Sequence, residues 1–165
     1  MSDTELAFYE SLPRSRGAAS ALLRDEVGRV LLVNPTYKPG WGMPGGTIEQ
    51  LESPLTACRR ECAEELGFVP HLTALACVDW VPPHLSPDGR PATAFVFAGT
   101  LTPGQFEAIR LPKDELSDAR LVDPADLAGH LPEPTARRIS ACLKAERTVY
   151  LEHGRPVDWS RPLAE

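Results

Sequence analysis

The chain lacks long apolar runs and concentrated positive charge. No apolar stretch approaches the roughly 18 residues of a membrane span, and no apolar segment typical of a secretory leader follows the N-terminus, so we expect neither feature. Lysine and arginine number 17 against 23 aspartate and glutamate, the net charge is −6, and no basic cluster stands out. We therefore expect no nucleic-acid or membrane partner, and an anionic substrate would need local Lys, Arg or metal charge.

Cysteine and histidine are also scarce, with four of each. No two cysteines form a C-x-x-C pair and no histidine stands at metal-ligand spacing from a cysteine, so a zinc site is not expected. Cys58 and Cys62 lie on the apolar stripe of a predicted helix, and we interpret them as buried free thiols. Reduced thiols indicate a cytoplasmic location.

The chain is long enough for one domain with a sizeable core. It has 165 residues, of which 42% are hydrophobic and 24% charged, an ordinary globular balance. No repeat, low-complexity run or linker is present. We therefore expect a single domain over residues 1–165, with residues 1–16 as an N-terminal arm that contains one helical turn at Glu5–Leu12.

Hydrophobic periodicity predicts a hairpin, a helix, further strands and two more helices. The expected strands are Ala18–Leu23, Arg29–Val33, Leu72–Val81, Thr93–Leu101 and Leu116–Val122, with a closing hairpin at Thr148–Val157. A short helix is expected from Asp123 to about Leu131 and a long one at Pro134–Glu146, whereas residues 102–116 are interpreted as irregular. This order is typical of an α/β protein with a mixed sheet between helices.

The helix that follows Ser53 has the strongest local signals. Ser53 is a favourable N-cap, Pro54 suits the first helical position, and Gly67 suits the left-handed residue that ends a helix. Between these caps, one apolar stripe predicts the buried side. It consists of Leu55, Cys58, Cys62 and Leu66.

Three carboxylates share another face of this helix. Glu61, Glu64 and Glu65 stand at i, i+3 and i+4, where like charges repel by a few tenths of a kcal/mol. Arg60 can reach Glu64, but one cation cannot neutralise three acids. Mg²⁺ prefers carboxylate oxygens together with substrate phosphates, and Gly46 lets the preceding backbone come close enough to add its carbonyl.

These residues carry a resemblance to a known family. The run Gly46-x5-Glu52-x7-Arg60-Glu61-Cys62-Ala63-Glu64-Glu65-Leu66-Gly67-Phe68 resembles the Nudix box of the Nudix hydrolases, and Trp41–Gly46 resembles its lead-in. Two positions depart from the usual pattern: Cys62 replaces a larger aliphatic residue, and Leu51 stands where a glycine commonly precedes the first glutamate. The resemblance implies the Nudix-type α/β/α sandwich with a mixed sheet between helices.

The resemblance also implies a reaction: Mg²⁺- or Mn²⁺-dependent cleavage of a diphosphate bond in a nucleoside diphosphate derivative or a nucleoside triphosphate. Glu64 and Glu65 are the first candidates for metal ligands, and Glu61 is either a ligand or the base. Arg60 would orient the glutamates, and Glu52 would contact either Arg60 or the metal shell. The family often recruits a further acid, for which Glu115 and Glu107 are candidates.

The substrate and the oligomeric state stay open at this point. Lys38, Trp41, Asp79 and Trp80 are candidate substrate contacts. Trp41 would either stack on a base or pack under the glycine loop, and Pro82–Pro91 would form a rim. Two other functions remain: hydrolysis of a non-nucleotide substrate such as a prenyl diphosphate, and a catalytically silent nucleotide-binding module. A homodimer is also open.

Overall fold

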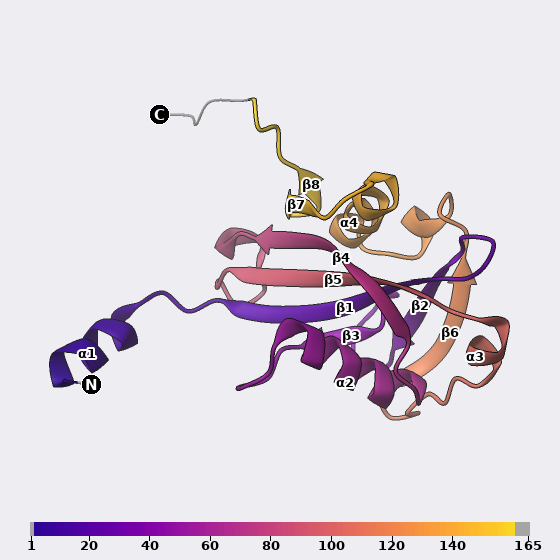
Figure 1. Ribbon diagram of the computed structural model, residues 1–165, viewed down its shortest axis with the longest axis horizontal. Coiled ribbons are helices and arrows are strands. Elements are labelled where there is room, and N and C mark those ends of the chain that lie inside the picture. Colours follow the sequence, from indigo (N-terminus) through magenta and orange to yellow (C-terminus); the bar gives the residue numbers. More distant parts are fainter. Residues whose placement is uncertain (1, 161–165) are drawn as a thin grey trace.

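A computed structural model describes residues 2–160 and places a mixed β-sheet between helices (Figure 1). Within these residues the sheet has eight strands, in the order β6-β2-β1-β5-β4-β7-β8, with β3 paired to β1. The strands are β1 Arg16–Arg24, β2 Val30–Pro35, β3 Gly45–Thr47, β4 His71–Val81, β5 Ala92–Thr100, β6 Leu116–Val122, β7 Val149–Glu152 and β8 Arg155–Pro156. The helices are α1 Asp3–Ser11, α2 Pro54–Leu66, α3 Pro103–Glu107 and α4 Glu133–Lys144, with 3-10 turns η1 Pro83–Leu85 and η2 Leu127–Gly129.

The sheet is mixed, as the sequence predicts. β1 runs parallel to β5 and β4 runs parallel to β7, whereas the pairs β1–β2, β2–β6 and β4–β5 are antiparallel. The chain between β6 and β7 carries α4 over one face of the sheet, and α2 covers part of the other face (Figure 1). The predicted α/β/α arrangement is therefore confirmed.

Alternate side chains of the central strands enter two separate cores. Leu22, Leu32 and Val96 pack on the α4 side. Leu23 and Leu31 pack with the buried stripe of α2 on the opposite side. Because successive side chains of a strand point to opposite faces, the near-continuous apolar runs of β1 and β2 reflect burial on both sides.

Helix α2 begins and ends at the predicted residues. Ser53 Oγ accepts a hydrogen bond from the Thr56 N–H at 3.1 Å, and Gly67 adopts a left-handed conformation with φ +84°. Cys58, Cys62 and Leu66 are fully buried. The caps are confirmed, and three of the four residues of the predicted stripe are buried, whereas Leu55 is only partly buried. The two free thiols behave as small core residues.

Two local predictions were wrong. Residues 102–116 are not wholly irregular, because Thr102 caps the short helix α3 through a reciprocal pair of bonds with Gln105. The helix expected from Asp123 does not form beyond the 3-10 turn η2. Asp123 Oδ1 accepts from the Ala125 N–H at 2.9 Å, which favours a local turn over a helix.

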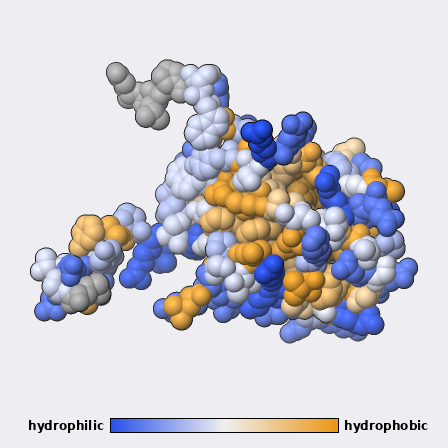
Figure 2. Space-filling view, viewed as in Figure 1, coloured by the Kyte–Doolittle hydropathy of each residue, from blue (hydrophilic) through white to orange (hydrophobic). Residues whose placement is uncertain are grey.

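The N-terminal arm stands apart from the sheet (Figure 1). Its helix α1 is capped by Ser2 and buries none of its residues. Figure 2 shows apolar side chains on this arm and a second apolar region over β4, β5 and β1. None of the helices within residues 2–160 has the length and apolar character needed to cross a membrane.

The backbone of the turn before α2 explains why the Nudix pattern commonly has a glycine at the position that Leu51 occupies in this chain. Leu51 has a left-handed backbone with φ +71°, and its side chain is fully exposed. The Glu52 N–H donates to the Glu49 carbonyl at 3.2 Å and closes this turn. The backbone thus has the conformation that a glycine adopts without strain, whereas a residue with a Cβ pays about 1–2 kcal/mol for it.

We predict that Leu51→Gly is more stable than Leu51→Ala by roughly 0.5–1 kcal/mol. Both changes remove the same exposed side chain, but only glycine relieves the left-handed strain, and its greater freedom in the unfolded chain offsets part of the gain. Urea unfolding of the two variants at one pH measures the difference. Equal stabilities would show that this turn is unstrained.

Candidate functional site: an acidic helix face held by Arg60

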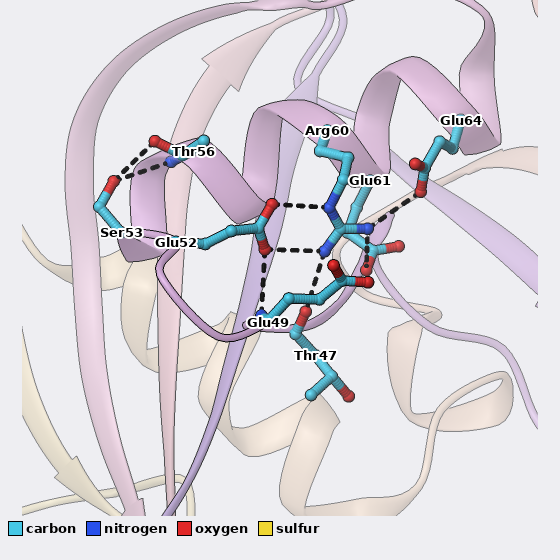
Figure 3. Close-up of polar contacts among 8 residues, drawn as sticks. All are labelled: Thr47, Glu49, Glu52, Ser53, Thr56, Arg60, Glu61 and Glu64. Atoms are coloured by element: carbon cyan, nitrogen blue, oxygen red, sulfur yellow. Dashed lines mark hydrogen bonds and ion pairs between the residues drawn. The ribbon is translucent and has the colours of Figure 1, made fainter.

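The guanidinium of Arg60 joins the loop after β3 to the acidic face of α2 (Figure 3). Its Nε and Nη2 donate to the two oxygens of Glu52 at 2.8 and 3.0 Å, and Nη2 also donates to the Thr47 carbonyl at 3.1 Å. Its Nη1 donates to Glu61 and Glu64, each at 3.0 Å. The rigid, planar fork of donors suits such multiple pairing. The expected contacts of Arg60 with Glu52 and the glutamates are therefore present.

Gly46 allows Glu61 to lie against the backbone of β3. A Cβ at this position would lie 2.4 Å from Oε1 of Glu61, so any other residue would displace the carboxylate. Gly46 is itself fixed by pairing with Ala19 of β1. The sheet thus sets the position of the backbone against which Glu61 packs, and the predicted close approach of Gly46 to the acidic face is present.

Glu65 is a buried carboxylate with one backbone donor. It is 8% exposed, and its Oε2 accepts from the Gly45 N–H at 2.7 Å. Burial raises the pKa of Glu65 to about 7, and the negative charges of Glu61 and Glu115 act in the same direction. The Gly45 bond and the Lys38 ammonium lower the pKa of Glu65, but they do not offset burial.

Glu115 contributes its charge to this site from outside the Nudix box. Burial raises the pKa of Glu61, Arg60 opposes this, and the charges of Glu64 and Glu115 raise the pKa further. Glu115 therefore acts on both Glu61 and Glu65, and Glu107 is not among the main causes of either shift.

The backbone of Glu115 is held in place by the chain that precedes Lys38. The Thr36 N–H donates to the Glu115 carbonyl at 2.8 Å. The hydroxyl of Thr36 donates to the Asp114 carbonyl at 2.7 Å. These bonds connect the turn before β6 to the end of β2, which explains how two segments far apart in sequence reach one site.

The acidic side chains do not converge on one point. Within residues 2–160, no three His, Cys, Asp or Glu side chains are placed to hold a metal ion. Glu61 and Glu64 turn toward Arg60, and Glu65 turns toward Gly45. The donor set nevertheless fits a hard divalent cation, because it consists of crowded carboxylates, whose oxygens are the ligands that such a cation prefers. The Glu64 side chain is 54% exposed, so it can leave Arg60 without disturbing the core.

The predicted substrate contacts lie in different settings. Lys38 is exposed, with its Nζ 5.4 Å from the centroid of the Tyr37 ring. Trp41 is half-buried, with the Arg120 guanidinium 4.7 Å above its ring and His130 edge-on at 6.0 Å. Trp41 also packs against the core on the α4 side of the sheet. Trp80 is partly exposed near the end of β4.

Asp79 does not fit the predicted substrate contact, because it is fully buried. Its Oδ2 accepts from Arg138 Nε at 2.6 Å, and both oxygens accept from the Gly154 N–H at 3.0 Å. Asp79 therefore ties β4 to α4 and to the turn between β7 and β8. Its partners are 59 and 75 residues away in sequence, and no local pattern identifies them.

Comparison with known proteins agrees with the fold and the acidic helix. The NUDIX domain family matches residues 14–143. The m7GpppN-mRNA hydrolase of Saccharomyces cerevisiae is 36% identical over 61 residues, which are 37% of this chain and 6% of that protein. The MutT NUDIX hydrolase structure from Burkholderia pseudomallei is 27% identical with a TM-score of 0.64, covering 80% of this chain and 99% of that one. The NUDIX domain of Shewanella oneidensis NrtR, complexed with ADP ribose, is 21% identical with a TM-score of 0.69, covering 87% and 98%.

The mixed sheet with an Arg60-bound acidic helix defines a Nudix-type protein. The chain belongs to the Nudix hydrolase family, whose domain spans most of it. It spans less than a tenth of the length of the curated yeast relative that it matches.

We predict that the stability of the metal-free protein falls with pH because of Glu65. The pKa of Glu65 is about 7 in the folded state against 4.5 in the unfolded chain, so the native state binds this proton more tightly. This contribution is fully present below pH 4.5 and is lost as the pH rises through 7. In EDTA, Glu65→Gln should match wild type near pH 4.5 and exceed it at pH 8.5 by on the order of 2 kcal/mol.

Glu107→Gln is the control for this experiment, because it removes an exposed carboxylate away from the site. Denaturant unfolding in EDTA across this pH range measures all three proteins. The control should keep the wild-type pH dependence. A wild-type-like pH dependence in Glu65→Gln would show that Glu65 is not the group responsible.

Proposed function

We propose that this protein is a Mg²⁺-dependent hydrolase that cleaves the diphosphate bond of a nucleoside diphosphate derivative or a nucleoside triphosphate. The observation that carries the proposal is the acidic face of α2, which is held by Arg60 and lies against Gly45 and Gly46 through Glu65 and Glu61. A diphosphate is anionic, so a face of carboxylates would repel it unless a cation lay between them. Membership of the Nudix hydrolase family supports the same reaction.

Each residue of the face has a proposed task. Glu64 and Glu65 are the metal ligands, the Gly46 carbonyl is a further ligand, and Glu61 is either a ligand or the base. A bound Mg²⁺ would offset the charge of the phosphate oxygens and activate water. Arg60 is a positioning residue, because its bonds to Glu52 and Thr47 hold the guanidinium that orients Glu61 and Glu64. Burial raises the pKa of Glu61, and a higher pKa makes its carboxylate a stronger proton acceptor.

Two observations support a nucleotide as the substrate. The NUDIX domain of NrtR, with a TM-score of 0.69 to this chain, is complexed with ADP ribose. The yeast relative is named as an m7GpppN-mRNA hydrolase, so its substrate contains a nucleotide. Lys38 lies near the acidic face, where its charge lowers the pKa of Glu65, and we propose that it meets a substrate phosphate.

We predict that hydrolysis requires Mg²⁺ or Mn²⁺ and stops in EDTA. A panel of nucleoside diphosphate derivatives, nucleoside triphosphates and a prenyl diphosphate, assayed for released phosphate, pyrophosphate and nucleoside monophosphate, measures the activity. Glu64→Gln should lower kcat by at least about 10²-fold, the scale for losing preorganised charge stabilisation. Turnover that survives complete chelation would contradict the metal dependence. Ligand-induced stabilisation without turnover under every metal condition would identify a binding module instead.

A second prediction concerns Glu115, which we propose as the extra acid. Glu115→Gln should lower kcat at least about tenfold, a threshold set below the usual effect of removing a proton-transfer group. Glu107→Gln should leave kcat unchanged. Because the charge of Glu115 raises the pKa of Glu65, the same variant should shift the stability transition of the metal-free protein to lower pH. A shifted transition with unchanged kcat would leave Glu115 as a neighbouring charge without a role in the reaction.

A further inference from the structure

A cleft lies between α4 and the β7–β8 hairpin, and its lining shares no residue with the acidic site. Its volume is about 720 Å³, within the usual range for small-molecule sites. The acidic residues belong to α2 and the loop after β3, on the opposite side of the sheet from α4 (Figure 1). The cleft is therefore separate from the proposed reaction.

One face of α4 forms the floor of this cleft. Arg137, Ser140, Ala141 and Lys144 line it at i, i+3, i+4 and i+7, so they share one side of the helix. The inward side of the same helix is used by the core. The small side chains of Ser140 and Ala141 recess the floor between Arg137 and Lys144, which lie two turns, roughly 10 Å, apart.

The β7–β8 hairpin forms the opposite wall of the cleft and contributes its third cation, Arg155. Arg155 and Pro156 line the cleft there, and Leu131 and Ala128 close it with apolar surface. Glu133 is the single carboxylate of the lining. The lining thus has an excess of two positive charges, in a chain whose net charge is −6.

Two of these cations, Lys144 and Arg155, are not neutralised by the part of the chain that the structure describes. Glu133 pairs with Arg137, and within residues 2–160 no carboxylate pairs with Lys144 or Arg155. The Nε of Arg137 is buried with no partner there. The local potential is therefore positive and suited to an anion.

The two walls are held in place before any ligand arrives. Arg137 Nη2 donates to the His153 carbonyl at 3.0 Å, and buried Asp79 binds both Arg138 of α4 and the Gly154 N–H. A Cβ at Gly154 would lie 2.4 Å from the Pro134 carbonyl, so the turn packs directly on α4. Such preorganisation reduces the entropy cost of binding.

We propose that this cleft binds a phosphate monoester of about the size of a nucleoside monophosphate. A phosphate monoester carries a charge of about −1.5 to −2 at pH 7, which matches the excess of two positive charges. The Arg155 guanidinium, which has no carboxylate partner within residues 2–160, can pair with phosphate in bidentate geometry. The apolar wall and the volume exceed what inorganic phosphate needs, so they accommodate the organic body of the ligand.

Isothermal titration calorimetry with AMP in EDTA tests the proposal. The wild type should bind one AMP, inorganic phosphate should bind at least tenfold more weakly, and adenosine should not bind. The double variant Lys144→Gln/Arg155→Gln should weaken AMP binding at least tenfold without changing the melting temperature, because both side chains are exposed. Ser140→Trp, which fills the floor, should abolish AMP binding.

Two further proteins locate the ligand. Arg90→Gln removes an exposed cation elsewhere and should bind AMP like wild type. Glu65→Gln alters the acidic site and should also bind AMP like wild type. The proposal is overturned if AMP does not bind, if the double variant binds normally, or if inorganic phosphate binds as tightly as AMP. It is also overturned if Glu65→Gln, rather than the double variant, changes the affinity.

Discussion

The crowding of carboxylates against one guanidinium is the constraint on which the site depends. Arg60 bonds to Glu52, Glu61 and Glu64 and to the Thr47 carbonyl, so its loss would release the loop and the helix face together. Glu65 lies outside this set and relies on the Gly45 N–H alone. The carboxylates repel one another in the native state but are far apart in the unfolded chain. Their repulsion therefore lowers the free energy of unfolding. A cation that binds only the native state would return that energy.

Strand pairing in the sheet holds the backbone against which these carboxylates are crowded. β3 is a short strand, yet its pairing with β1 fixes Gly45 and Gly46 at the point where α2 approaches. Glycine at 46 admits the Glu61 carboxylate, and the Gly45 N–H meets Glu65 inside the protein. The electrostatic cost is thereby confined to side chains whose backbone is held in α2 or beside the paired strand β3. This rigidity is what a site needs if charge is to be placed before the substrate binds.

Local signals in the sequence account for most of the fold and for the acidic face, whereas distant contacts do not. The caps of α2, its buried stripe and the i, i+3, i+4 carboxylates follow from residues within one helix, and the structure agrees with them. The partners of Asp79 lie 59 and 75 residues away, so its buried role has no local signature. The stacking of Arg120 on Trp41 also has no local signature in the sequence, because it depends on how β6 pairs with β2. Between these cases lies Glu115, whose residue type makes it a candidate while only the fold places its charge beside Glu61 and Glu65.

The arrangement also separates charge across the sheet. On one side, α2 presents carboxylates, and on the other, α4 presents Arg137 and Lys144 to a cleft. The central strands between them are buried on both faces, so the two groups of charge lie in solvent on opposite sides of the sheet, where water and salt screen each from the other. On the two proposals above, an organic phosphate in metal-free solution would meet repulsion at one face and attraction at the other. A metal ion bound to the carboxylates would reverse the sign only at the acidic face, so the two faces would bind phosphate groups under different conditions.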